Sequence, residues 1–134
     1  MIWTGLGRFR DFGLLLMRVG LGVMMFFHGL PKIQGGPEKW KALGGAMAHL
    51  GIQFFPHVWG FLAAFAETGG AVLLVIGFFF RPAALMLAIT MAVAVTMHVK
   101  TGDGFGDWSH AAELLIVFVG LFFVGPGRYS IDRN

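Results

Sequence analysis

The 134-residue chain is 57% hydrophobic and only 13% charged, with a mean hydropathy of +0.75. Soluble domains carry about 25% charged residues, so this composition argues against a water-soluble globule, and the chain is too apolar for disorder. Its net charge is only +3, without a basic run, so we expect no nucleic-acid partner. Cysteine is absent, which excludes disulfides, thiolate nucleophiles and cysteine-ligated clusters in this chain.

Four continuous apolar blocks follow one another along the chain. They cover about residues 11–30, 57–80, 82–99 and 109–124. Each block is near the roughly 20 residues that cross ~30 Å of hydrocarbon. Continuous runs favour helices, because the strands of a membrane barrel would alternate apolar and polar residues. We therefore predict an all-α membrane protein, a single domain over residues 1–134 built as a bundle of four transmembrane helices.

The connections between the blocks differ in length. The longest joins the first two blocks over residues 31–56 and is expected as a long loop on the outer side of the membrane. Apolar residues recur at helical spacing within residues 38–50, which predicts a short helix at the outer interface. The second and third blocks meet at residues 80–82, which predicts a tight hairpin with Pro82 in a first helical turn.

An even number of spans places both termini on one side of the membrane. The basic residues expected on that side are all arginines: Arg8, Arg10, Arg81, Arg128 and Arg133. The opposite side holds four lysines: Lys32, Lys39, Lys41 and Lys100. This small excess favours the arginine side as the cytoplasmic one. We expect an inner (cytoplasmic) membrane protein with both termini in the cytoplasm.

Two ionisable residues lie deep inside the predicted spans. At ~1.5 Å per residue, Glu67 lies roughly 15 Å and Arg18 roughly 18 Å below the outer surface. An unpaired buried charge costs several kcal/mol, so we predict a buried Arg18–Glu67 ion pair. Small residues on the Glu67 face of its helix indicate that Glu67 points into a helix contact. The pair is either structural, fixing the helix register, or part of a proton relay or ligand site.

A second polar group is predicted near the outer ends of the spans. Its members are His28, Lys32, His98, His110 and Glu113. Imidazoles titrate near neutral pH and can pass protons, and His110 and Glu113 share one side of a helix at i, i+3. We expect this group to bind a quinone headgroup or another polar ligand, with Glu113 and His98 as catalytic candidates. A hydrated structural network is the alternative, and no metal site is predicted.

Several motifs in order along the chain resemble those of the DoxX family. They are Arg18 with Gly22, residues 28–32 (HGLPK), 66–70 (AETGG), 81–84 (RPAA) and 125–132 (GPGRYSID). The resemblance implies a small four-helix inner-membrane protein of a bacterium or archaeon. The family takes its name from a subunit of a thiosulfate:quinone oxidoreductase, or terminal quinone oxidase, so the resemblance also implies a quinone as ligand.

Three functions remain open at this point. The first is a quinone-linked subunit of a membrane oxidoreductase, which would receive electrons from a partner. The second is a non-catalytic accessory or structural subunit of a larger membrane complex. The third is a small solute or proton carrier. The expected partners are membrane lipid and either other membrane subunits or further copies of the chain.

Overall fold

The computed structural model describes residues 2–133. In this part of the chain the α-helices are α1 (Arg10–Gln34), α2 (Gly36–Gly44), α3 (Pro56–Ile76), α4 (Phe80–Lys100) and α5 (Phe105–Val124). Two 3-10 helices, η1 (Thr4–Phe9) and η2 (Gly45–Leu50), precede α1 and follow α2. No strand occurs among the described residues, and the predicted all-α fold is confirmed.

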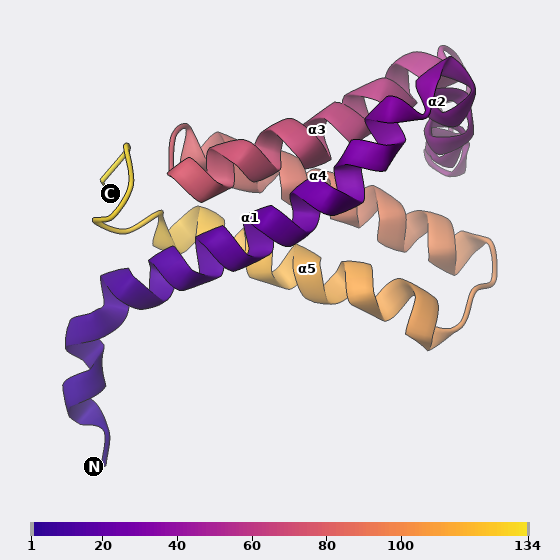
Figure 1. Ribbon diagram of the computed structural model, residues 1–134. Helices are drawn as coiled ribbons and strands as arrows, with labels where there is room; N and C mark the ends of the chain where they lie inside the picture. The colour runs from indigo at the N-terminus through magenta and orange to yellow at the C-terminus, as the bar shows by residue number, and fades with distance from the viewer. Residues whose placement is uncertain (1, 134) are drawn as a thin grey trace.

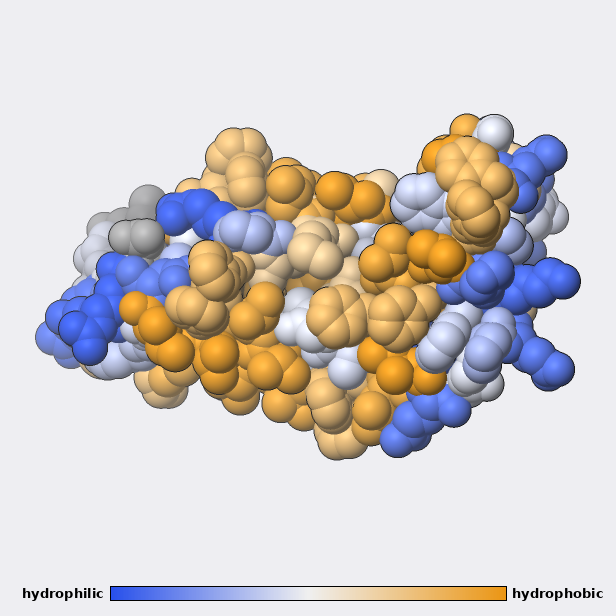
Figure 2. Space-filling view, turned by 90° about the horizontal axis from the view of Figure 1, so that it is seen from above, coloured by the Kyte–Doolittle hydropathy of each residue, from blue (hydrophilic) through white to orange (hydrophobic). Residues whose placement is uncertain are grey.

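Four helical segments within residues 2–133 are long and apolar enough to cross a membrane, as predicted. They are Thr4–Gln34, which joins η1 to α1, and the three helices α3, α4 and α5. Figure 1 shows both chain ends at one end of the bundle, here named the terminal end. The opposite end, with α2 and the α4–α5 turn, is named the loop end. Figure 2 shows an apolar belt between two polar ends, the surface that suits a helix bundle in a bilayer.

Two helix boundaries differ from the expected spans. α3 ends at Ile76, because Gly77 takes the left-handed φ of 70° that commonly stops a helix. The hairpin turn is therefore residues 77–79, and Pro82 lies in the first turn of α4 as predicted. α1 continues through Pro31 to Gln34, since two of its last carbonyls find donors beyond the helix. The Gly35 N–H donates to the Pro31 carbonyl and Trp40 Nε1 donates to the Lys32 carbonyl, at 3.0 and 3.1 Å.

Most of the connection that was expected as a long loop is helical. It consists of α2 and η2, and α2 packs closely along the first turns of α3. Two glycines allow this approach, because a Cβ at Gly44 would overlap the Pro56 carbonyl and one at Gly60 would overlap the Trp40 carbonyl. The helix expected over residues 38–50 is thus α2 followed by η2, while its depth relative to the membrane surface stays a prediction.

The remaining helices pack in a chain around a buried core. α1 crosses α3 at Gly22 and Gly29, where an added Cβ would lie 2.9 Å from a backbone atom of α3. α4 packs between α3 and α5 and contributes Phe80 and Leu87 to the core, both fully buried. The backbone of α5 packs closely only against α4 among the described helices. The four spans thereby surround a space near the loop end.

Candidate functional site

Arg18 binds backbone carbonyls and does not pair with Glu67. Its hydrogen bonds run from Nε to Leu74 O (3.2 Å), from Nη1 to Pro126 O (3.1 Å) and Tyr129 O (2.9 Å), and from Nη2 to Val75 O (2.8 Å). The residue is 1% exposed. Leu74 and Val75 lie in the last turn of α3, whose carbonyls lack helical partners and carry the negative end of the helix dipole. The predicted Arg18–Glu67 pair is wrong because these carbonyls already compensate the guanidinium.

The segment that follows α5 closes over the terminal end. The N–H groups of Ile131 and Asp132 donate to the carbonyls of Ile76 and Gly77, at 3.3 and 2.9 Å. The Asp132 carboxylate accepts hydrogen bonds from the Phe79 and Phe80 N–H groups, at 3.2 and 2.8 Å. It thereby caps α4, whose first N–H groups have no helical acceptor. The closing GPGRYSID motif has a structural role here, which sequence reasoning missed.

Glu67 forms its ion pair with Lys32 of α1. Lys32 Nζ lies 2.9 Å from each carboxylate oxygen of Glu67. The Glu67 side chain is 6% exposed and that of Lys32 is 32% exposed. Lys32 reaches Glu67 because α1 continues past Pro31 and keeps Lys32 on the helix. Burial of Glu67 was predicted correctly, but its partner was not.

A polar cavity of about 170 Å³ lies beside this ion pair, between α1, α3, α4 and α5. Its polar lining consists of His28, Lys32, Glu67, His98, Asp107 and His110. We call this space the polar cavity. It brings together four of the five residues that the sequence placed near the outer ends of the spans and adds two carboxylates. Asp107 lies three residues before His110 on α5, and that spacing is the signal that could have identified it.

The histidines of the polar cavity are held in two different ways. The rings of His28 and His110 lie next to each other, with centroids 6.3 Å apart and planes inclined by 53°. His98 Nδ1 lies 2.7 Å from Asp103 Oδ2. The hydrogen bonds from His98 and Thr101 lower the pKa of Asp103, which lies in the α4–α5 turn. Because Nδ1 of His98 is bound to Asp103, Nε2 is the ring nitrogen of this lining residue that stays open to other partners.

Glu113 lies outside the polar cavity. It is exposed on α5 and is not among the residues that line the space. The lining positions of α5 are 107, 110, 111 and 114, and Glu113 lies roughly 100° around the helix from their mean direction. The predicted grouping of Glu113 with the histidines is therefore wrong. A spacing of i, i+3 puts two residues on one side of a helix without aiming both at the same cavity.

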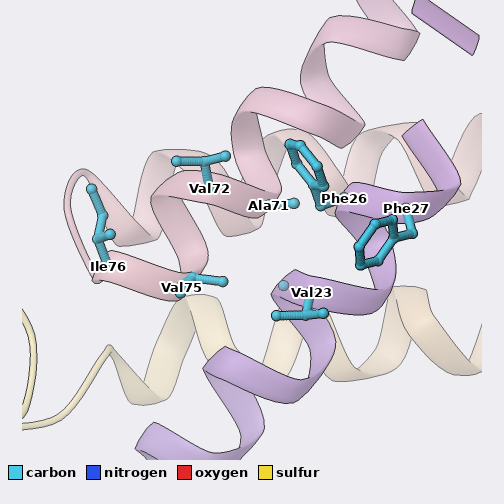
Figure 3. A pocket seen from close by; sticks show the side chains of 8 residues that line it. Val23, Phe26, Phe27, Ala71, Val72, Val75 and Ile76 are labelled. Carbon is cyan, nitrogen blue, oxygen red and sulfur yellow. The ribbon is translucent and has the colours of Figure 1, made fainter. Parts of the chain in front are cut away.

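A second cavity of about 320 Å³ lies between α1 and α3 and is wholly apolar. Figure 3 shows its lining, which includes Val23, Phe26 and Phe27 of α1 with Val72 and Val75 of α3. On α1 these residues point away from Met25, His28 and Lys32, so the two cavities lie on opposite sides of the helix. Only apolar groups suit this second space.

Within residues 2–133 no group of three or more His, Asp or Glu side chains is placed to hold a metal ion.

Comparison with known proteins gives one family and several relatives. The DoxX family model matches residues 13–99. The chain is 32% identical to the inner membrane protein YphA of Escherichia coli, with 95% of this chain and 97% of that protein covered. It is 28% identical to the E. coli inner membrane protein YqjF, with 94% of each chain covered. It is 26% identical to the putative oxidoreductase CatD of Bacillus subtilis, with 91% of this chain and 86% of that protein covered. No solved structure matches the chain significantly.

Proposed function

The chain belongs to the DoxX family of membrane proteins, and from that premise we propose that it is a quinone-linked subunit of a membrane oxidoreductase. The observation that carries the proposal is the polar cavity, where six titratable side chains converge inside an otherwise apolar bundle. Ionisable groups inside membrane spans are costly and mark ligand sites or proton paths. The relative from B. subtilis, named a putative oxidoreductase, supports the same reaction class.

The size of the polar cavity favours a small ring. Pockets for drug-sized ligands typically measure about 300–1,000 Å³, and the polar cavity measures about 170 Å³. A single quinone ring suits this space better than a flavin or a haem. The imidazoles of His28 and His98 and the ammonium of Lys32 are the donors that would bind the ring oxygens.

The same side chains can move protons. A bound quinone takes up two electrons and two protons when it is reduced to the quinol. Glu67 is buried against Lys32 and can hold one proton at its carboxylate. His110 lies beside His28 at the loop end and can pass protons between the polar cavity and the outer surface. Electrons would come from a partner subunit, as expected for a chain without cysteine.

Quinone binding by the purified protein tests this function. The probe is a short-chain ubiquinone titrated against protein in lipid nanodiscs, with intrinsic tryptophan fluorescence as the readout. We expect His98→Ala and Lys32→Met to weaken binding about tenfold, the loss of one hydrogen bond to a ligand. His57→Ala is the matched control, because His57 is exposed on the first turn of α3, outside the polar cavity.

The outcome separates the quinone site from other roles. Equal affinity in His98→Ala, Lys32→Met and the parent protein would contradict the proposed site. An absence of quinone binding by the parent protein would contradict the function and favour the accessory subunit. Circular dichroism of each variant checks that its helix content is unchanged.

We also propose the membrane orientation and the type of partner. The terminal end carries five arginines, and the acidic side chains Asp11 and Asp132 near them are engaged in hydrogen bonds. The positive-inside rule then favours the cytoplasm for the terminal end. The polar cavity would open toward the outer face, and the electron-donating partner would be a membrane subunit that contacts the bundle laterally.

A further inference from the structure

Among residues 2–133, one face of α5 packs against no other helix. Its residues recur every three and four positions: Ser109, Glu113, Ile116, Gly120 and Phe123. We call this face the α5 seam. It points away from the buried side of α5, which carries Ala111, Phe118 and Leu121. Figure 1 shows α5 at the lower edge of the bundle, with α4 as its close neighbour. Residues spaced alternately three and four positions apart form the interface between two helices that pack side by side.

Glu113 places an unpartnered carboxyl group on the α5 seam at membrane depth. Eleven residues separate it from Val124 at the terminal end, about 16 Å at 1.5 Å per residue. That distance lies near the middle of a ~30 Å hydrocarbon core. Within residues 2–133, the Glu113 side chain forms no hydrogen bond or ion pair. An ionised carboxylate facing lipid is costly, so the group must be neutralised by a proton or paired with another chain.

The chain itself limits what a second copy could offer to Glu113. Arg18 is buried and bound to carbonyls, and His110, one turn from Glu113 on α5, lines the polar cavity. The other lysines and arginines of residues 2–133 lie in the first or last turn of α1, α3, α4 or α5 or outside these helices. A neutral carboxyl group is, however, complementary to itself, because it donates through O–H and accepts through the second oxygen. Two copies related by a two-fold axis along the α5 seam would bring Glu113 against Glu113.

Gly120 supports the same pairing. It lies on the α5 seam two turns beyond Glu113, and a Cβ there would meet no atom within 4 Å. The absence of a side chain therefore serves no contact within the chain. Small residues at a lipid-facing helix surface let two backbones approach closely.

We propose that the α5 seam is a homodimer interface, with α5 of a second copy packed in parallel across a two-fold axis. The two Glu113 carboxyl groups hydrogen-bond to each other in the membrane interior, and Gly120 lies at the closest approach of the helices. This interface is separate from the polar cavity, so its test does not depend on quinone binding.

Site-directed cross-linking tests the geometry without background, because the chain contains no cysteine. Ile116→Cys places a thiol on the α5 seam, where Ile116 is 72% exposed. Ile89→Cys is the matched control, since Ile89 is 57% exposed on α4 and both residues lie about 12–14 Å from the terminal end of their helix. Membranes that carry either variant are oxidised with copper phenanthroline at low protein density. We expect a disulfide-linked species of twice the chain mass for Ile116→Cys and little for Ile89→Cys.

Substitutions on the α5 seam then test the contacts. Energy transfer between labelled copies in phosphatidylcholine vesicles measures the dimer dissociation constant. Glu113→Leu removes the hydrogen bonds and should raise the constant roughly 3- to 16-fold, the range for interhelical hydrogen bonds in membranes. Glu113→Gln should retain dimerisation, because carboxamides also pair. Gly120→Leu should weaken the dimer without disturbing the fold, since a Cβ added at this position meets no atom of its own copy within 4 Å.

Three results would overturn the proposal. One is equal cross-linking of Ile116→Cys and Ile89→Cys. Another is an Ile116→Cys conjugate whose mass shows a different protein, which would assign the α5 seam to another subunit. The third is a dissociation constant that neither Glu113→Leu nor Gly120→Leu changes, while both variants keep the parent's helix content.

Discussion

Arg18 joins two segments that are far apart in the sequence. One guanidinium binds two carbonyls at the end of α3 and two in the segment that follows α5. Arginine suits this position because its planar group presents donors in several fixed directions, whereas the ammonium of lysine is a single point. The charge is compensated by carbonyl dipoles, which leaves Glu67 free to pair with Lys32.

Arg18→Lys should destabilise the protein by about 1.5 kcal/mol or more, because an ammonium has three donors for the four carbonyls and at least one charge-assisted hydrogen bond of ~1.5 kcal/mol would be lost. Unfolding in mixed detergent micelles, followed by circular dichroism, measures the change in free energy. Arg10→Lys is the control, since Arg10 is exposed and forms one long hydrogen bond to the Val124 carbonyl, at 3.5 Å. Equal stability of the two variants would show that the carbonyl contacts of Arg18 contribute little.

The helix α2 depends on glycines for its position on α3. Gly44 and Gly60 remove side chains where the two backbones meet. The packing places the start of α2 over the end of α1, where Trp40 donates to the Lys32 carbonyl. This contact supports the α1 turn that presents Lys32 to Glu67. The packing of α2 thus helps to shape the polar cavity, although α2 contributes no lining residue.

Substitutions of two glycines in α3, Gly60 and Gly69, test the packing of α2 on α3. Gly60→Ala should destabilise the protein by at least about 2 kcal/mol, because a Cβ that overlaps the Trp40 carbonyl reaches the upper end of the about 1–3 kcal/mol that overpacking costs, and better helix propensity returns at most about 1 kcal/mol. Gly69→Ala should be neutral or slightly stabilising, since an added Cβ lies 3.5 Å from the Phe65 ring, an ordinary contact. Thermal unfolding of both variants makes the comparison. A Gly60→Ala variant as stable as Gly69→Ala would mean that α2 does not pack closely on α3.

On the scale of the whole molecule, the two polar ends have different roles. The terminal end is closed by the segment after α5, through Arg18 and Asp132. The loop end contains the polar cavity and its ion pair. An apolar belt separates the two ends (Figure 2). The proposed ligand or proton would therefore reach the cavity from the loop end or laterally from the membrane, and not through the closed terminal end.

The proposed orientation predicts which end reacts with a reagent outside the cell. Gly104→Cys in the α4–α5 turn and Gly7→Cys in η1 both place a thiol at a position where an added Cβ meets no atom within 4 Å. A membrane-impermeant maleimide applied to intact cells should label Gly104→Cys, and it should label Gly7→Cys only after the membrane is permeabilised. The reverse pattern would place the terminal end outside the cell and overturn the proposed orientation.

Much of the architecture follows from the sequence alone. The lengths of the apolar blocks predicted four spans and the all-α fold, and the ordered motifs predicted the family. Residue spacing also placed His28, Lys32, His98 and His110 near one end, and the structure gathers them around one cavity. These predictions hold because hydropathy and a rise of 1.5 Å per residue determine the depth of a residue in the membrane.

The tertiary structure decided which side chains meet. Depth alone made Arg18 and Glu67 look like partners, but Arg18 binds the end of α3 and Glu67 binds Lys32. Glu113 has the depth of a buried group and nevertheless lies on the outer face of α5. Side-chain partners depend on the rotation of each helix about its axis and on its neighbours. Contacts between distant residues, such as those at Gly22 and Gly60, determine both, and spacing along one helix does not contain that information.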